Sequence, residues 1–499
     1  MRQKYFLIFA SVLFFSYFSE ALELDWSGQF RTEAHYVLNY ALDSSNITVN
    51  AAQEAGKGYY ISGGGSNKAT FQTLFLKLRP KIIVNDNIYL KSEWWVSDPI
   101  YGFFGSGVPY TVDQRQYYST QSRGSLISAQ RLWAEFLSDI GTFQVGRAPL
   151  HWGLGVVWSQ GDGLWDRYES TGDVIRLVSK FGSFSFNPAL IKYSQGNNIG
   201  GAAGVLPYAP VAGDGTVMDY SLMLKYENPD EDFEGGVHFV KRIAGSVQDR
   251  FLGIGTTAAQ AAVGMNFNIW DLYAQKKFSR IKLAGEVPIT SGQIAGIEYS
   301  SYAIALEAGW KITDSWDLAL RAGQAPGQQN ITTAAPDKYK IFYFNPNYRL
   351  GLIMFNYQLA NFQGPNTQNN PATAADTLLS PFDNPITNAN YLNMDLAFHL
   401  SRWSFHSNWT FAQAKDVAAP GYSFYNTWKK QYFPAIGTQS RALGWEMDYG
   451  AIFQWDEAFQ FQFDFGFFFP GSFYKFSNTA TENTTSTVIA GVANVGLTF

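Results

Sequence analysis

The feature that most constrains this chain is a strict alternation of apolar and polar side chains over segments longer than most strands of soluble proteins. In the segment 459–469, phenylalanine occupies every second position, and the positions between hold mainly glutamine, aspartate and glycine. Because successive side chains of a β-strand point to opposite faces, this segment has one fully aromatic face. In water such a face would promote aggregation, whereas in lipid it is an ordinary outer wall.

The same alternation recurs along the chain. It begins at the segment 24–40, where apolar residues share one parity and polar residues the other. Further examples are the segments 220–226, 302–310, 392–398 and 445–453. A membrane strand needs about 9–11 residues and alternates lipid-facing with lumen-facing side chains. The pattern therefore predicts an all-β fold, a transmembrane antiparallel β-barrel.

The connections between these segments are of two kinds, short polar turns and long loops rich in Gly, Asn, Ser, Thr and Ala. About eight short turns are expected in the periplasm. They lie at 85–87, 138–141, 181–182, 228–230, 278–280, 313–315, 401–402 and 456–457. About nine long extracellular loops, such as 43–69, 98–127 and 194–217, complete a barrel of about eighteen strands with both ends in the periplasm.

The stretch 324–389 is ambiguous, because its polar, Asn- and Pro-rich sequence contains the apolar segment 340–359. It is either one long loop with a packed hairpin or an additional pair of strands. We expect the loop.

The two ends of the chain carry export signals. Residues 1–21 combine two positive charges, an apolar run and a small-x-small site, which predicts a secretory signal peptide, and residues 22–499 then form the barrel. The last strand alternates apolar residues and ends in Phe499. With Val495 and Leu497 it resembles the C-terminal signal that the barrel-assembly machinery reads in outer-membrane barrels.

Composition narrows the possible functions. Cysteine is absent, only 15% of the residues are charged, and the net charge of -5 gives no basic surplus for nucleic acid.

Among the five histidines, His406 precedes a serine, but neighbours on a strand point to opposite faces, so Ser407 cannot give its proton to His406. We therefore expect no enzymatic activity, no cofactor and no metal site.

The polar parity of the strands predicts a charged lumen. Basic residues gather on early strands and acidic residues on late strands, which would give a transverse field across the pore. Alternatively, these charges only solvate a water-filled interior. The pore-lining candidates are Arg31, Lys77, Arg79, Lys81, Lys91, Arg131, Arg176, Glu446, Asp448 and Asp464.

One block of about 35 residues resembles a known family. Val145-Gly146-Arg147, His151-Trp152-Gly153, Gly163 to Arg167 and Thr171 to Leu177 are similar to a strand–loop–strand block of porin-like eighteen-strand barrels, including the alginate-export family. The resemblance implies that the loop 148–172 folds inward and narrows the pore, although an outward surface loop is the alternative. The candidate constriction residues are Asp162, Trp165, Asp166, Arg167 and Glu169.

Together these patterns predict a porin-like channel in the bacterial outer membrane for passive diffusion of small hydrophilic solutes. A polysaccharide export or uptake conduit and a structural or adhesive barrel remain as alternatives. The expected partners are outer-membrane lipid, lipopolysaccharide, the barrel-assembly machinery and the solutes themselves.

Overall fold

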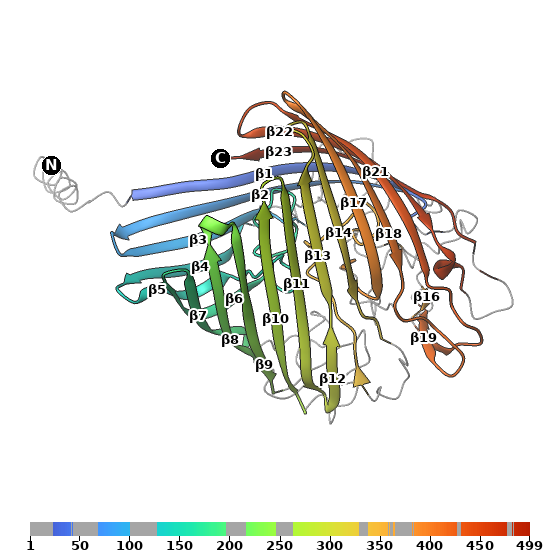
Figure 1. Cartoon of the computed structure of the whole chain (residues 1–499), viewed down its shortest axis with the longest axis horizontal. Coiled ribbons are helices and arrows are strands. Elements are labelled where there is room, and N and C mark those ends of the chain that lie inside the picture. The colour runs from blue at the N-terminus through green and yellow to red at the C-terminus, as the bar shows by residue number, and fades with distance from the viewer. Residues whose placement is uncertain are drawn as a thin grey trace, which may run out of the picture.

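The computed structural model is a closed β-barrel (Figure 1). It describes residues 23–40, 42, 68–99, 127–195, 216–245, 263–328, 338–357, 359, 363–364, 382, 384–426, 431–476, 482 and 484–499. The predicted signal peptide therefore lies outside the described residues. No helix within these ranges is long and apolar enough to cross a membrane.

Eighteen antiparallel strands form the barrel wall, with β12 and β13 as two parts of one interrupted strand. The first nine are β1 (Glu23–Leu38), β2 (Lys68–Asn85), β3 (Ile88–Ser97), β4 (Ile127–Ser138), β5 (Gly141–Pro149), β6 (Thr171–Phe181), β7 (Phe184–Gln195), β8 (Thr216–Asn228) and β9 (Phe233–Ala244). The others are β10 (Met265–Phe278), β11 (Ile281–Ile294), β12 (Ile297–Tyr302), β13 (Ile304–Lys311), β14 (Trp316–Ala325), β17 (Ala389–Leu400), β18 (Trp403–Gln413), β21 (Ala442–Gln454), β22 (Phe459–Pro470) and β23 (Val488–Thr498). The expected strand number and fold class are confirmed.

The last strand closes the barrel onto the first. β23 pairs with β1 from Gln29 opposite Thr498 to Leu38 opposite Ile489. At the end of this seam, Gly28 N donates to Phe499 O at 2.8 Å, and Phe499 N donates to Gly28 O at 3.1 Å. The C-terminus accordingly lies beside β1 in Figure 1. Every described wall strand therefore pairs with a neighbour on both sides, as lipid requires.

A single proline interrupts the wall. β11 pairs with β13 up to Glu286 and with β12 from Ile289 onward. Pro288 lies between these two stretches and has no N–H to donate, although its carbonyl accepts from Ala303 N at 3.0 Å. This is why one continuous wall strand is divided into β12 and β13.

All eight short turns expected from the sequence connect consecutive wall strands. At the opposite end, the connection from β11 to β12 differs from the expected long loops, because it is only the pair Ala295-Gly296. Both residues have positive φ, 50° and 79°, which is the backbone of a two-residue hairpin turn. The expectation of nine long loops is therefore wrong at this position.

The two faces of the wall divide as the alternation predicts. On β22, Phe461, Phe463 and Phe465 point outward and are 42%, 54% and 38% exposed, whereas Asp464 points inward and is 6% exposed. The aromatic face therefore meets the membrane, and the polar face meets the barrel interior.

The stretch 324–389 adds no strand to the wall in its described part. Its segment β15 (Lys338–Tyr339) makes only a short parallel pairing with β12. β16 (Gln363–Gly364) pairs instead with β19 (Ser423–Asn426), which pairs with β20 (Gln431–Pro434) in a small separate sheet. The expected loop is thus what the structure shows.

We predict that Phe463→Arg destabilises the barrel by about 2–4 kcal/mol, since it places a charge on the lipid face of a spanning strand. Gln462→Arg is the matched control, because the neighbouring side chain points into the polar interior. Urea-dependent unfolding in lipid vesicles measures both free energies. Equal losses for the two variants would contradict the assignment of the faces.

Candidate functional site: the barrel interior

Among the described residues, two long segments enter the barrel interior. We call residues 150–170, which connect β5 to β6, the first arm, and residues 338–357, which follow β14, the second arm. The contacts below link both arms to inward-facing side chains of strands from opposite parts of the wall. The first arm lies within the loop that the family resemblance places in the pore.

Basic side chains of the early strands bind the carbonyl oxygens of the first arm. Arg31 Nη1 donates to Asp166 O at 2.6 Å and also to Leu164 O. Lys77 Nζ donates to Gly161 O at 2.8 Å, and Arg131 Nη2 donates to Gln160 O at 2.6 Å. These carbonyl groups have no hydrogen-bond partner in a neighbouring strand, so the basic side chains satisfy them. Each bond is strengthened by the charge of its donor.

Carboxylates neutralise the same cations. Glu33 pairs with Arg31 at 3.2 Å and also with Arg167 of the first arm. Glu93 lies 3.1 Å from Arg131 and 3.7 Å from Lys77. Glu169 of the first arm accepts from Lys77 Nζ at 2.6 Å, and Asp162 pairs with Arg79.

This pairing differs from the expected lumen, in which basic residues of the early strands would line the pore. Arg31, Lys77 and Arg131 face the interior, but each is only 2% exposed. They lie under the first arm with their charges compensated, because leaving an unpaired charge in the interior would be costly. They anchor the arm and are not open to a passing solute.

The opposite wall holds the arms through carboxylates. Glu286 of β11 accepts from Leu154 N and Val156 N of the first arm. Glu446 of β21 accepts from Ile353 N at 2.7 Å and from Met354 N. Asp448 accepts from Leu352 N at 3.0 Å. Wall cations thus bind carbonyl groups of the arms, and wall carboxylates bind N–H groups.

Asparagines of the second arm join the two arms. Asn345 N donates to Val156 O at 2.7 Å. The Asn347 side chain accepts from the backbone N–H groups of Arg167 and Tyr168 and donates to Tyr168 O at 2.6 Å. The two arms therefore form one body across the lumen, which we call the septum.

Arg349 adds a charged contact between the arms. Its Nη2 donates to Trp165 O at 2.7 Å. Burial, together with the nearby Arg167, lowers the pKa of Arg349 to about 10. The guanidinium therefore keeps its charge at neutral pH.

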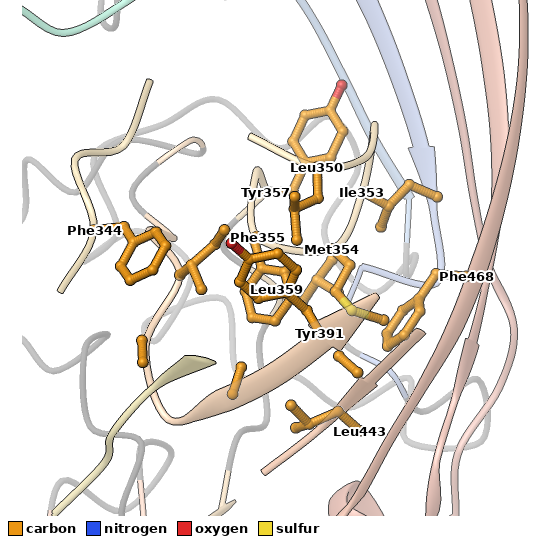
Figure 2. Close-up of a cluster of buried hydrophobic side chains, with 14 of the residues drawn as sticks. Phe344, Leu350, Ile353, Met354, Phe355, Tyr357, Leu359, Tyr391, Leu443 and Phe468 are labelled. Carbon is orange, nitrogen blue, oxygen red and sulfur yellow. The ribbon is translucent and has the colours of Figure 1, made fainter. Parts of the chain in front are cut away.

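The second arm also packs through apolar side chains (Figure 2). Ile353 and Met354 are buried in the same cluster as Phe468 of β22 and Leu443 of β21. Nearby, His35 Nδ1 lies 2.8 Å from the Tyr357 hydroxyl. Burial in this apolar cluster explains why the segment 340–359 is apolar although it forms no wall strand.

The other residues predicted to line the pore contact wall side chains, and the residues of the predicted assembly signal lie on the last strand. Arg176 donates to Gln144 at 2.7 Å, Lys91 pairs with Glu135 at 2.8 Å, and the Lys81 ammonium lies over the Tyr89 ring. Asp464 lies 3.0 Å from His406. On the last strand, the half-exposed Val495 and Leu497 face outward, and Phe499 closes the seam with β1.

His406 and Ser407 lie on opposite faces of β18, as the geometry of a strand requires. His406 faces Asp464 in the interior, whereas the Ser407 hydroxyl accepts from Trp409 Nε1 at 2.9 Å on the outward face. These two residues cannot act as a base and nucleophile pair.

Sequence reasoning placed the segment 340–359 in a long loop but did not predict its course through the lumen, and it missed the carboxylates Glu33, Glu93 and Glu286. Their inward parity was readable, since Glu33 follows Arg31 by two positions on the same face. What the sequence did not indicate was that Glu33 also binds Arg167 of the first arm and that Glu286 binds its backbone N–H groups, because these partners lie far away in the sequence.

These features define an outer-membrane-type, porin-like barrel of eighteen strands whose lumen is crossed by a septum. No family model and no curated protein matches the sequence. Solved structures do match.

The chain is similar to OccK2 (OpdF) of Pseudomonas aeruginosa, with a TM-score of 0.50, 7% identity, and coverage of 96% of this chain and 98% of that chain. OccK9 (OpdG) and OccK8 (OprE) of the same organism have TM-scores of 0.49 and identities of 11% and 10%. They cover 96% of this chain and 99% and 98% of their own. At such identities the likeness to OccK2 concerns the fold, and the expected porin-like fold is confirmed.

We predict that Asn347→Leu separates the arms locally. The backbone amides of Arg167 and Tyr168 lose their acceptor, so their hydrogen exchange should accelerate about tenfold or more. Asn187→Leu is the control, since this inward asparagine of β7 shows no hydrogen bond to either arm among the described residues. Unchanged exchange at Arg167 and Tyr168 would mean that the arms are not coupled through Asn347.

Proposed function

We propose that the protein is a passive outer-membrane channel for small hydrophilic solutes and that the septum is its constriction. The observation that carries this proposal is the set of ion pairs on the inner wall that stay partly exposed. Arg321 and Glu307 are 31% and 32% exposed, and Lys225 and Glu234 are both 28% exposed. The arms leave these inward-facing side chains uncovered, so water could reach them and hydrate the lumen.

A hollow beside the septum supports the same proposal. It has a volume of about 400 Å³, and its lining includes Trp95, Gln130, Arg167, Glu169 and Tyr193. A space of this size has room for several water molecules. A small polar solute would find hydrogen-bond partners there and an aromatic face as well.

The porin-like fold supports both function and location. A closed barrel with an apolar outer belt is stable only in a membrane, and barrels of this kind belong to the outer membrane. The residues predicted as the signal peptide and as the assembly signal Val495, Leu497 and Phe499 would bring the chain there. Binding of lipopolysaccharide and of the barrel-assembly machinery remains part of this proposal.

The polysaccharide conduit is less favoured. It would need an exposed basic wall as a guide for an acidic polymer, and Arg31, Lys77 and Arg131 are buried and paired. A catalytic role has no support in the His406 and Ser407 geometry described above. We therefore propose a channel that acts without catalysis or cofactor.

We predict stable single-channel steps when the refolded mature barrel is inserted into planar bilayers. Replacing residues 152–169 by a Gly-Ser linker of equal length removes the first arm from the lumen, so the conductance should rise about twofold or more.

Three other results would change the proposal. Silence from a barrel that is verifiably folded would favour the structural or adhesive alternative. Block by acidic but not by neutral sugars would favour the polysaccharide conduit. An unchanged conductance after the replacement would mean that the first arm is not part of the constriction.

A further inference from the structure

Two wall carboxylates hold the arms by the same device. Glu286 receives the N–H groups of Leu154 and Val156, and Glu446 receives those of Ile353 and Met354. β11 and β21, which carry these glutamates, are separated along the wall by several strands. Each carboxylate therefore fixes one arm, and the two arms are fixed from different parts of the wall.

A glycine lets each arm approach its carboxylate. A Cβ atom on Gly153 would lie 2.5 Å from Glu286 Oε2, and a Cβ atom on Gly351 would lie 2.5 Å from Glu446 Oε1. Real Cβ atoms do not come so close to an oxygen, so with any other residue either the arm or the carboxylate end would have to shift, and the hydrogen bonds between them would lengthen. The recurrence of glycine at both contacts indicates that the close approach is a built feature.

Both carboxylates are completely buried, at 0% exposure. Each has an aspartate beside it, Asp271 next to Glu286 and Asp448 next to Glu446, and these are at most 3% exposed. Burying such groups is costly unless donors satisfy them. Backbone N–H groups of the arms supply donors to both glutamates, so the wall groups and the arms depend on each other.

We propose that Glu286 and Glu446 are positioning residues that hold the arms across the lumen and thereby set the width of the passage and the size limit of the solutes. This inference rests on the proposed channel function. The two carboxylates neither contact the solute nor select it by charge. They act through the arms that they hold.

The two sites differ in a way that makes the proposal testable. Glu446 uses its two oxygens for two different N–H groups, so an amide in its place would turn an NH₂ group toward one of these donors. Glu286 uses the single oxygen Oε2 for both of its N–H groups, and a glutamine keeps that acceptor. Glu446→Gln should therefore release its arm, whereas Glu286→Gln should not. Glu286→Ala removes the acceptor and should free the first arm at Leu154 and Val156, while wall cations still hold it at residues 160–166.

Hydrogen exchange of the refolded barrel tests the contacts directly. In Glu446→Gln, the amides of Ile353 and Met354 should exchange about tenfold faster, as expected for loss of a charge-assisted hydrogen bond. Gly351→Ala should have the same effect through a change on the arm instead of the wall. In Glu286→Ala the amides of Leu154 and Val156 should accelerate, and in Glu286→Gln they should not.

Glu135→Gln is the matched control, because this inward carboxylate of β4 binds Lys91 and belongs to neither contact. Heat-modifiable gel mobility verifies that every variant forms a barrel. If Glu446→Gln fails to fold, Gly351→Ala still tests the contact, since it leaves the wall intact. Unchanged exchange in both Glu446→Gln and Gly351→Ala would overturn the proposal.

Conductance separates this inference from the proposed function. If wild-type protein conducts, Glu446→Gln and Glu286→Ala should conduct more and admit larger neutral polymers, whereas Glu286→Gln and Glu135→Gln should match wild type. If wild-type protein is silent but the released variants conduct, the positioning role stands and the open channel is refuted. If wild-type protein conducts and the released variants are indistinguishable from it, the positioning role is refuted and the channel stands.

Discussion

The whole structure depends on the rule that a backbone polar group in lipid must find its partner within the protein. A sheet can obey this rule only by closing, and the closure here is the seam between β1 and β23. Its end is secured by the reciprocal bonds of Gly28 and Phe499. Once the seam exists, every second residue of each strand faces lipid, and the residues between face the interior.

The same rule applies inside the barrel, where most of the backbone of the arms forms no hydrogen bonds to a neighbouring strand. Wall side chains take the place of those backbone partners. Arg31, Lys77 and Arg131 donate to carbonyl oxygens of the first arm, and Glu286 and Glu446 accept from N–H groups of the two arms. The charged interior therefore has a structural task before it has any contact with a solute. Each of these charges has either an opposite charge or a backbone group of an arm as its partner, as burial requires.

The arrangement divides the interior residues by role. Buried charges under the septum hold the arms, while the pair Arg321 and Glu307 on the inner wall stays partly exposed. A sequence pattern cannot separate these two groups, since both share the same parity on their strands. Only the course of the arms decides which wall residues they cover.

The sequence by itself determined the parts of this protein that rest on local rules. Alternation with a period of two specified the strands and their faces, and polar turn residues at sites such as Asn85 and Ser401 specified the eight short connections. Tertiary structure alone decided the partners of Glu286 and Glu446, the path of the second arm, and the burial of the basic residues. The physical reason is that a strand's faces follow from neighbouring residues, whereas the contacts of Glu286 and Glu446 with the arms join residues more than 90 positions apart.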